Sequence, residues 1–351
     1  MKKRIQVLMV VLLIFSAVGC GKKQEEVDEE AIIRAKIMDT ELDRLVELER
    51  KEAELETEIG MESEVESEEN LEKEMEIESE IEKETEELKE SESVELVDVE
   101  QTKEVIQWSD TWKYAGNSKI HSDSVTLYKA VGNQKNIVIA VNAGHGTIGG
   151  SSVRTLCHPD GSPKTTGGST GKGEIEASAV SGGTTMMDGT PESLVTLMLA
   201  VVVKDTLLEN GYDVLMIRES EDVQIDNVAR TIYANNNADC HISLHYDSSD
   251  MDKGLFCIGV PDIASLKSME PVASHWREHN SLGDSVVKGA KSQGIKIYGD
   301  GFMGIDLTQN SYSTIPSIDI EVGDRKSDYS DRMLTNLAKG IVAGIDNYFG
   351  Y

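Results

Sequence analysis

The chain has little of what marks several common protein classes. Its 351 residues include 4 cysteines and 6 prolines, and aromatic side chains make up 5%. The cysteines form no CxxC pair, so the sequence indicates neither a disulfide scaffold nor a cysteine-based zinc site. After the first 20 residues, no apolar run approaches the roughly 18 residues of a membrane-spanning helix. A basic excess is also missing, and the net charge of −30 argues against a nucleic-acid partner.

The first 20 residues have the pattern of an export signal. Met1–Arg4 is basic, Ile5–Phe15 is almost wholly apolar, and small residues precede Cys20. Such a short apolar core predicts a signal peptide, residues 1–20, rather than a spanning helix. A cysteine directly after Gly19 resembles the cleavage site of bacterial lipoproteins, which implies lipidation of Cys20 and a membrane anchor. Plain secretion with an incidental cysteine is the alternative.

The negative charge is concentrated in one segment. Residues 21–100 contain 33 Asp and Glu but only 10 Lys and Arg. Apolar residues at helical spacing run from Ile33 to Ile59, and beyond them glutamate dominates, with too few apolar side chains for a core. We therefore expect 21–105 to be an acidic stalk, partly helical or disordered, that holds a domain away from a membrane. A coiled coil that binds a partner or a second copy is an alternative for residues 31–60.

The remainder has the alternation of strand-like and helix-like segments that is typical of an α/β domain. We expect residues 106–135, with three aromatic residues near their start, to be a linker that packs on this domain. Residues 136–351 predict one three-layer domain with a mixed, mostly parallel sheet flanked by helices. The expected strands are 136–142, 212–218, 240–246, 255–260 and 315–322. The expected helices are 192–209, 222–237, 276–292 and 329–348.

A long insertion, residues 147–190, follows the first expected strand. It is rich in Gly, Ser and Thr. A connection of this length is usually functional or disordered. Because it begins just after a Gly-His-Gly turn, we expect it to form a loop or lid over a site there. One hypothesis is that it occludes that site until a ligand or a partner binds.

Three expected strands each bring one polar side chain to their carboxyl end, the edge where open α/β sheets keep their sites. These side chains are His145, His245 and Glu321. Glu192 begins the helix 192–209, where an acidic residue also complements the helix dipole. Two imidazoles and a carboxylate suit a catalytic Zn²⁺ whose fourth position is left to water. A carboxylate that does not bind the metal is then needed to carry the proton.

The order of these motifs, over about 136–349, resembles the zinc-dependent N-acetylmuramoyl-L-alanine amidases with His–Glu–His ligands. The motifs are Asn-Ala-Gly-His145-Gly, Glu192 with its helix, Arg218, Arg230-x-x-x-Ala-Asn, Ser-Leu-His245 and Ile-Pro-Ser-Ile-Asp-Ile-Glu321-Val-Gly. The resemblance implies one Zn²⁺ per chain on His145, Glu192 and His245, with Glu321 as catalytic base and acid. It implies cleavage of the amide between N-acetylmuramic acid and L-alanine, and therefore peptidoglycan as the partner. With the lipid anchor, this predicts an enzyme outside the cytoplasm that faces the cell wall.

The sequence also departs from the family pattern. Asn142 replaces the usual Asp, Asp247 follows a Tyr where a small residue and Asn are usual, and Asp324 replaces a Phe. We expect Asn142, Arg230 and Asp247 to contact the metal ligands and hold them in position without binding the metal themselves. The departures leave open an inactive or regulatory wall-binding lipoprotein on the same fold.

Two alternatives concern the ligands themselves. The 47-residue step from His145 to Glu192 is longer than usual and contains Glu174 and Glu176, either of which could replace Glu192 as a ligand. The segment His275-Trp-Arg-Glu-His279 matches the HxxEH pattern of another class of zinc peptidases. A pair of histidines on a helix surface is the simpler interpretation of that segment.

Overall fold

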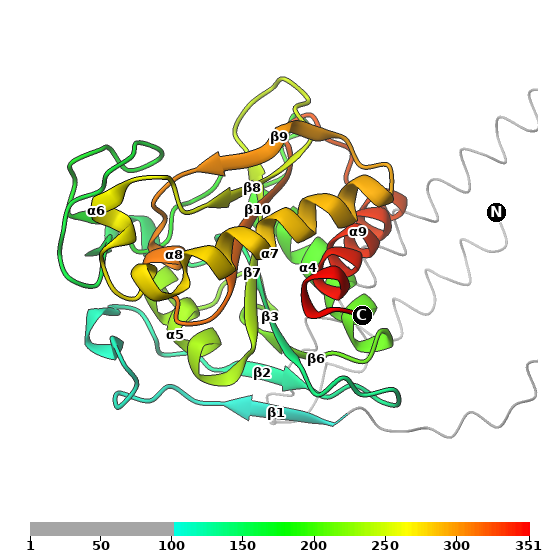
Figure 1. Ribbon diagram of the computed structural model, residues 1–351, viewed down its shortest axis with the longest axis horizontal. Coiled ribbons are helices and arrows are strands. Elements are labelled where there is room, and N and C mark those ends of the chain that lie inside the picture. Colours follow the sequence, from blue (N-terminus) through cyan, green and yellow to red (C-terminus); the bar gives the residue numbers. More distant parts are fainter. Residues whose placement is uncertain (1–101) are drawn as a thin grey trace, which may run out of the picture.

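The computed structural model describes residues 102–351 (Figure 1). The predicted signal peptide, Cys20 and nearly all of the predicted acidic stalk lie outside the described residues. Among the helices that are described, none is both long enough and apolar enough to cross a membrane.

An eight-stranded sheet forms the centre of the domain. Its strands are β1 (Lys103–Ile106), β2 (Val125–Tyr128), β3 (Val138–Ala143), β6 (Asp213–Met216), β7 (Cys240–Asp247), β8 (Leu255–Gly259), β9 (Ile297–Gly304) and β10 (Ser317–Asp324). The order across the sheet is β1-β2-β6-β3-β7-β10-β8-β9. The four central strands, β6, β3, β7 and β10, are parallel to one another. Strand β2 pairs antiparallel with β6, and β8 pairs antiparallel with β10. This confirms the predicted mixed, mostly parallel sheet.

Helices cover both faces of the sheet. On one face lie α4 (Glu192–Glu209), α7 (Val272–Ser292) and α9 (Asp331–Phe349), and α7 and α9 run side by side (Figure 1). On the other lie α5 (Asn227–Asn237) and the short α8 (Thr308–Tyr312), whose apolar residues meet in one cluster. A short helix, α6 (Ala264–Lys267), precedes α7, and 3₁₀ turns η1 (Ala115–Asn117) and η2 (Gly150–Ser152) lie in the loops.

The central strands bury their two faces differently. Alternate residues of β3, β7 and β10, including Ile139, Leu244 and Ile320, are fully buried against α4, α7 and α9. The residues between them point to the opposite face, because successive side chains of a strand alternate. On β7 and β10 these intervening residues are polar, so the α5 face carries a row of polar side chains where the strands end.

The folded domain begins earlier than predicted. The segment expected to be a linker contains β2, which pairs with β6, and the end of β1, which pairs with β2. Val125 and Leu127 of β2 are buried in the core. Trp108 and Trp112 each lie 5.4 Å, centroid to centroid, from the ring of Tyr233 on α5. The two tryptophans thus pack on α5. Strands β1 and β2, of four residues each, are too short to show a clear alternation in the sequence.

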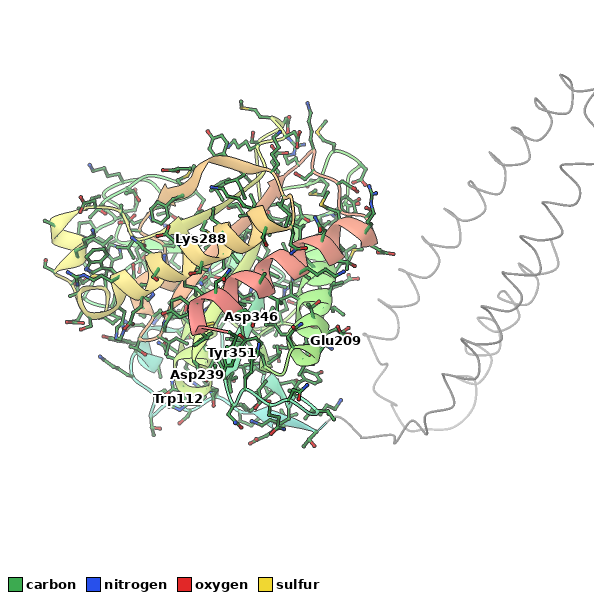
Figure 2. All side chains as sticks on the ribbon, turned by 45° about the vertical axis from the view of Figure 1, so that its right-hand side comes forward. Trp112, Glu209, Asp239, Lys288, Asp346 and Tyr351 are labelled. Carbon is green, nitrogen blue, oxygen red and sulfur yellow. The ribbon has the colours of Figure 1, made fainter. Side chains whose placement is uncertain are left out.

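Other boundaries shift for local reasons. The helix expected at 222–237 begins at Asn227, because Asp226 is its N-cap and accepts a hydrogen bond from the Ala229 amide at 2.8 Å. Strand β9 was not predicted, because Gly299 and Gly301, both with positive φ, interrupt its apolar pattern. Asp346 lies near the end of α9 (Figure 2). Its carboxylate accepts hydrogen bonds from Lys135 and Tyr212, both at 2.6 Å, which fastens the C-terminal helix to the segments just before β3 and β6.

The insertion 147–190 is folded and fastened to the domain. Its strands β4 (Arg154–Leu156) and β5 (Glu176–Ser178) form a small antiparallel sheet. Asp306, which is 1% exposed and lies between β9 and α8, anchors the insertion. Its carboxylate accepts from the Thr165 hydroxyl at 2.7 Å and lies 3.1 Å from Lys164 Nζ and 3.4 Å from His158 Nε2. Although burial raises the pKa of Asp306, His158 and the threonine donors hold it well below its usual range.

Asp306→Asn should destabilise the domain by about 3 kcal/mol at neutral pH, because it removes one partner of a buried charge network. Since the folded pKa is depressed, this contribution is present above the unfolded carboxyl pKa of about 4 and is lost as the pH falls below it. Urea unfolding at pH 7 and pH 3 measures both effects. Asp262→Asn removes an exposed partner of Lys267 and should change stability by less than about 1 kcal/mol. Equal losses for both variants would contradict the anchoring role.

Candidate metal centre

The candidate site lies where β3, β7 and β10 end, on the face opposite α7 and α9. In the sheet register, Asn142 lies beside Ser243, Ser243 beside Asp319, and His245 beside Glu321. Four of these side chains, Asn142, His245, Asp319 and Glu321, line one cavity of about 720 Å³ together with His145 and Glu192. Polar side chains of the neighbouring strands β7 and β10 thus meet His145, from the turn after β3, and Glu192, the first residue of α4.

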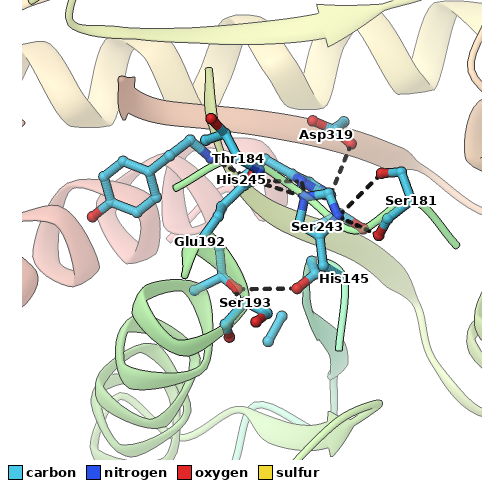
Figure 3. Close-up of polar contacts among 12 residues, drawn as sticks. His145, Ser181, Thr184, Glu192, Ser193, Ser243, His245 and Asp319 are labelled. Atoms are coloured by element: carbon cyan, nitrogen blue, oxygen red, sulfur yellow. Dashed lines mark hydrogen bonds and ion pairs between the residues drawn. The ribbon is translucent and has the colours of Figure 1, made fainter. Parts of the chain in front are cut away.

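Three side chains turn toward one point (Figure 3). His145 Nε2 lies 2.8 Å from Glu192 Oε1 and 3.0 Å from His245 Nδ1, and the latter two atoms are 3.1 Å apart. Tetrahedral zinc, with bonds of about 2.0–2.1 Å, places its ligand atoms about 3.3 Å from one another. A small outward movement of each side chain would therefore accommodate the ion. Among residues 102–351, no other group of three His, Cys, Asp or Glu ligands is gathered in this way.

The glycines beside His145 make room for this arrangement. A Cβ on Gly144 would come within 2.3–2.7 Å of three atoms of the His245 ring. A Cβ on Gly146 would lie 2.8 Å from the Arg218 guanidinium. His145 itself has φ +64°, in the left-handed region that non-glycine residues seldom adopt. The Gly-His-Gly turn therefore allows the second imidazole to pack directly on the backbone that carries the first.

The insertion supplies the groups that orient two of the three side chains. His145 Nδ1 lies 2.8 Å from the Ser181 carbonyl, which can only accept, so Nδ1 carries the proton and Nε2 is left as the donor atom for a metal. Glu192 Oε2 accepts a hydrogen bond from the Thr184 amide at 2.7 Å. Its Oε1 accepts from the Tyr246 amide at 3.0 Å. Segment 181–184 is therefore part of the site.

The charges of the three groups support one another. Burial opposes ionisation of Glu192, but the imidazoles of His145 and His245 beside its carboxylate hold its pKa well below the usual range. Burial also lowers the pKa of His245, yet the carboxylates of Asp319 and Glu192 raise it to about 10. A carboxylate that stays ionised between two imidazoles is a suitable environment for a divalent cation.

Glu321 lies in the same cavity but outside the ligand triangle. Its Oε2 is buried and has no hydrogen-bond partner. Burial, together with the nearby Asp319 carboxylate, raises the pKa of Glu321 well above its usual range. A carboxyl group kept protonatable by its surroundings is the type of group that serves as general acid and base.

The residues predicted to support the ligands have two different roles. Arg230 donates to Asn142 Oδ1 at 3.0 Å and to the His145 carbonyl at 2.6 Å, and Asn142 donates to Ser243 Oγ at 2.8 Å. These two residues brace the turn that carries His145. The Asp247 side chain instead pairs with Lys253 at the cavity wall and makes no hydrogen bond or ion pair with the three candidate ligands.

The alternative ligand sets do not converge in the structure. Glu174 and Glu176 are exposed and lie outside the cluster. On α7, His275 pairs with the exposed Glu278. The neighbouring His279 is buried, and its Nδ1 accepts a hydrogen bond from the Ser317 amide at 3.0 Å, so it is occupied by the backbone of β10. The HxxEH segment therefore has the structural role of a helix packed on the sheet.

Sequence reasoning missed three contributors: Asp319, Ser181 and Thr184. Asp319 precedes Glu321 by two residues on β10, so a period of two already placed both on one face. Thr184 contacts Glu192 through its backbone amide, and Ser181 contacts His145 through its carbonyl at 2.8 Å and its hydroxyl at 3.1 Å. The two backbone contacts carry no residue-type signal.

Gly183→Ala should weaken metal binding by about tenfold or more. Gly183 has φ +78°, and a Cβ there would lie 2.9 Å from the His145 ring and 3.0 Å from Glu192 Oε2. Gly189→Ala is a matched control, because Gly189 has φ +94° in the same insertion but nothing within 4 Å of the added atom. Competition with a chromogenic chelator measures zinc affinity. Equal affinities of the two variants would contradict this role of Gly183.

Comparisons with known proteins agree with the architecture. A family model described as N-acetylmuramoyl-L-alanine amidase matches residues 139–347, more than half of the chain. The solved amidase Ami1 from Mycobacterium smegmatis is 17% identical, with 61% of this chain and 97% of that chain covered and a TM-score of 0.50. Ami1 from Mycobacterium abscessus is 18% identical, with 61% and 99% covered and a TM-score of 0.49. A search of curated proteins gave no significant match.

Proposed function

Since the chain belongs to the N-acetylmuramoyl-L-alanine amidase family and is thus a cell-wall amidase, we propose that it works with one Zn²⁺ per chain, bound by His145, Glu192 and His245. The observation that carries this proposal is the triangle of three donor atoms 2.8–3.1 Å apart. An unpartnered carboxyl oxygen of Glu321 lies in the same cavity.

The donor set suits zinc. Two imidazole nitrogens and one carboxylate oxygen would be three protein ligands, the number used by catalytic rather than structural zinc sites. When bound, zinc supplies a Lewis acid that polarises a carbonyl and brings the pKa of water to about 7. The Ser181 carbonyl and the Thr184 amide hold the imidazole of His145 and the carboxylate of Glu192 in the orientation that this requires.

Glu321 then moves the proton. The reaction adds the oxygen of water to the lactyl carbonyl carbon of N-acetylmuramic acid and breaks the bond to the L-alanine nitrogen. Glu321 Oε2 takes a proton from the attacking water and returns it to that nitrogen, so that a carboxylic acid and an amine are released. Because Oε2 has no protein partner, it is available for both transfers.

The cavity matches a segment of a muropeptide. Its volume of about 720 Å³ lies within the range of ligand pockets, about 300–1,000 Å³. The cavity lining includes the apolar side chains of Phe256, Ile258 and Met303 as well as Ser, Thr and Gly residues of the insertion. The four positions proposed for catalysis are all filled, which favours an active enzyme over an inactive wall-binding protein.

Purified peptidoglycan digested by the full chain should yield stem peptides with a free L-alanine amine, detected by mass analysis, and the protein should contain about one zinc. Glu321→Gln should lower turnover by about 10²–10⁴-fold, since it removes the proton carrier, while zinc content stays unchanged. Glu174→Gln, at the exposed alternative carboxylate, should cleave like the wild type. Wild-type turnover in Glu321→Gln would contradict the mechanism.

We further propose that lipid on Cys20 anchors the enzyme at the outer side of the membrane and that the acidic stalk sets its reach into the wall. The support is the sequence pattern of residues 1–20 and the charge of residues 21–100. The wild-type chain should incorporate labelled palmitate in bacteria and partition into detergent. Cys20→Ser should do neither. If the Cys20→Ser protein incorporates palmitate and partitions into detergent, the proposed anchor is contradicted.

A further inference from the structure

Asp319 is a buried carboxylate that the proposed mechanism does not use. Asp319 lies in the middle of β10, is 6% exposed and lines the site cavity. Oδ1 is buried without a hydrogen-bond partner. Oδ2 lies 3.6 Å from His245 Nε2, the ring nitrogen that faces away from the ligand triangle (Figure 3). A buried carboxylate is costly unless it has a partner, so this position requires an explanation.

The register of the sheet explains why these two groups meet. Strands β7 and β10 are parallel, with Asp319 beside Ser243 and Glu321 beside His245. Asp319 is therefore the diagonal neighbour of His245 on the same face, at a separation that long side chains bridge. Lys253, a cation that also lines this cavity, is paired with Asp247 instead.

The imidazole of His245 is held on its other sides. Nδ1 lies 3.0 Å from His145 Nε2 and 3.1 Å from Glu192 Oε1, and the ring packs on the backbone of Gly144. A neutral imidazole that offers Nδ1 to a metal must carry its proton on Nε2, and that proton needs an acceptor. The other imidazole has one in the Ser181 carbonyl, 2.8 Å from His145 Nδ1.

We propose that Asp319 is the positioning residue of His245: its Oδ2 accepts the Nε2–H of the imidazole, which fixes the tautomer and presents Nδ1 to the metal. This inference rests on the proposed zinc site. A separation of 3.6 Å is longer than a hydrogen bond, and a slight rotation of the ring or carboxylate closes it when the ligands move outward around the ion. Carboxylates in this position raise the basicity of a ligand histidine, and their loss weakens metal binding by about 10–100-fold.

The test measures zinc affinity of the full chain by chelator competition, independently of amidase activity. Asp319→Ala should bind zinc about 10–100-fold more weakly. Asp319→Asn keeps an acceptor oxygen and should lose several-fold less. Asp247→Asn removes a carboxylate from the same cavity without touching a ligand, and its affinity should equal that of the wild type. Thermal unfolding of the metal-free proteins establishes that each variant is folded.

Cobalt substitution gives a second readout, because the visible absorption of Co²⁺ reports the orientation of its ligands. Asp319→Ala should change this spectrum, and Asp319→Asn should keep it. Wild-type zinc affinity in Asp319→Ala, or equal losses in the Ala and Asn variants, would overturn the positioning role alone. A wild-type chain that binds no zinc would overturn the proposed zinc site as well, so the two failures are distinguishable.

Discussion

A single buried anion, the carboxylate of Glu192, sets the arrangement around it. At 3% exposure it cannot be solvated by bulk water, and a buried carboxylate must be paired and hydrogen-bonded. It has four partners from three separate places: His145 after β3, His245 and the Tyr246 amide on β7, and the Thr184 amide in the insertion. The position of Glu192 at the start of α4 adds a favourable helix dipole. The interpretation of Glu192 as a dipole complement and its interpretation as a ligand are therefore compatible.

Because Glu192 must be hydrogen-bonded, the insertion also has a role in orienting the candidate ligands. A lid that merely covers a site has no need to contact its ligands. Segment 181–184, in contrast, supplies the acceptor for His145 Nδ1 and a donor to Glu192 Oε2. Its far side is fastened to the domain through Asp306. Removal of the insertion would therefore take away groups that orient two candidate ligands, which argues against the hypothesis that it only occludes the site.

Much of the site could be predicted because it follows strand periodicity. The apolar runs around His145, His245 and Glu321 are long enough to identify buried strands, and the carboxyl ends of parallel strands meet at one edge. Asp319 carries the same signal, because it lies two residues before Glu321 and therefore on the same face of the strand. The strands β1, β2 and β9 were not predicted, since they are short or interrupted by glycine. Contacts made by backbone atoms of the insertion leave no trace in residue type.

The departure from the family pattern at position 142 is consistent with an intact site. Asn142 accepts from Arg230 through Oδ1 and donates through Nδ2 to Ser243 Oγ, and Ser243 donates onward to Gln309 Oε1 at 2.5 Å. A carboxylate at 142 has no donor, so it could not start this directed chain of hydrogen bonds. Arg230 keeps its position through the carbonyl groups of Ala143 and His145. The amide thus belongs to a hydrogen-bond network that braces the turn carrying His145.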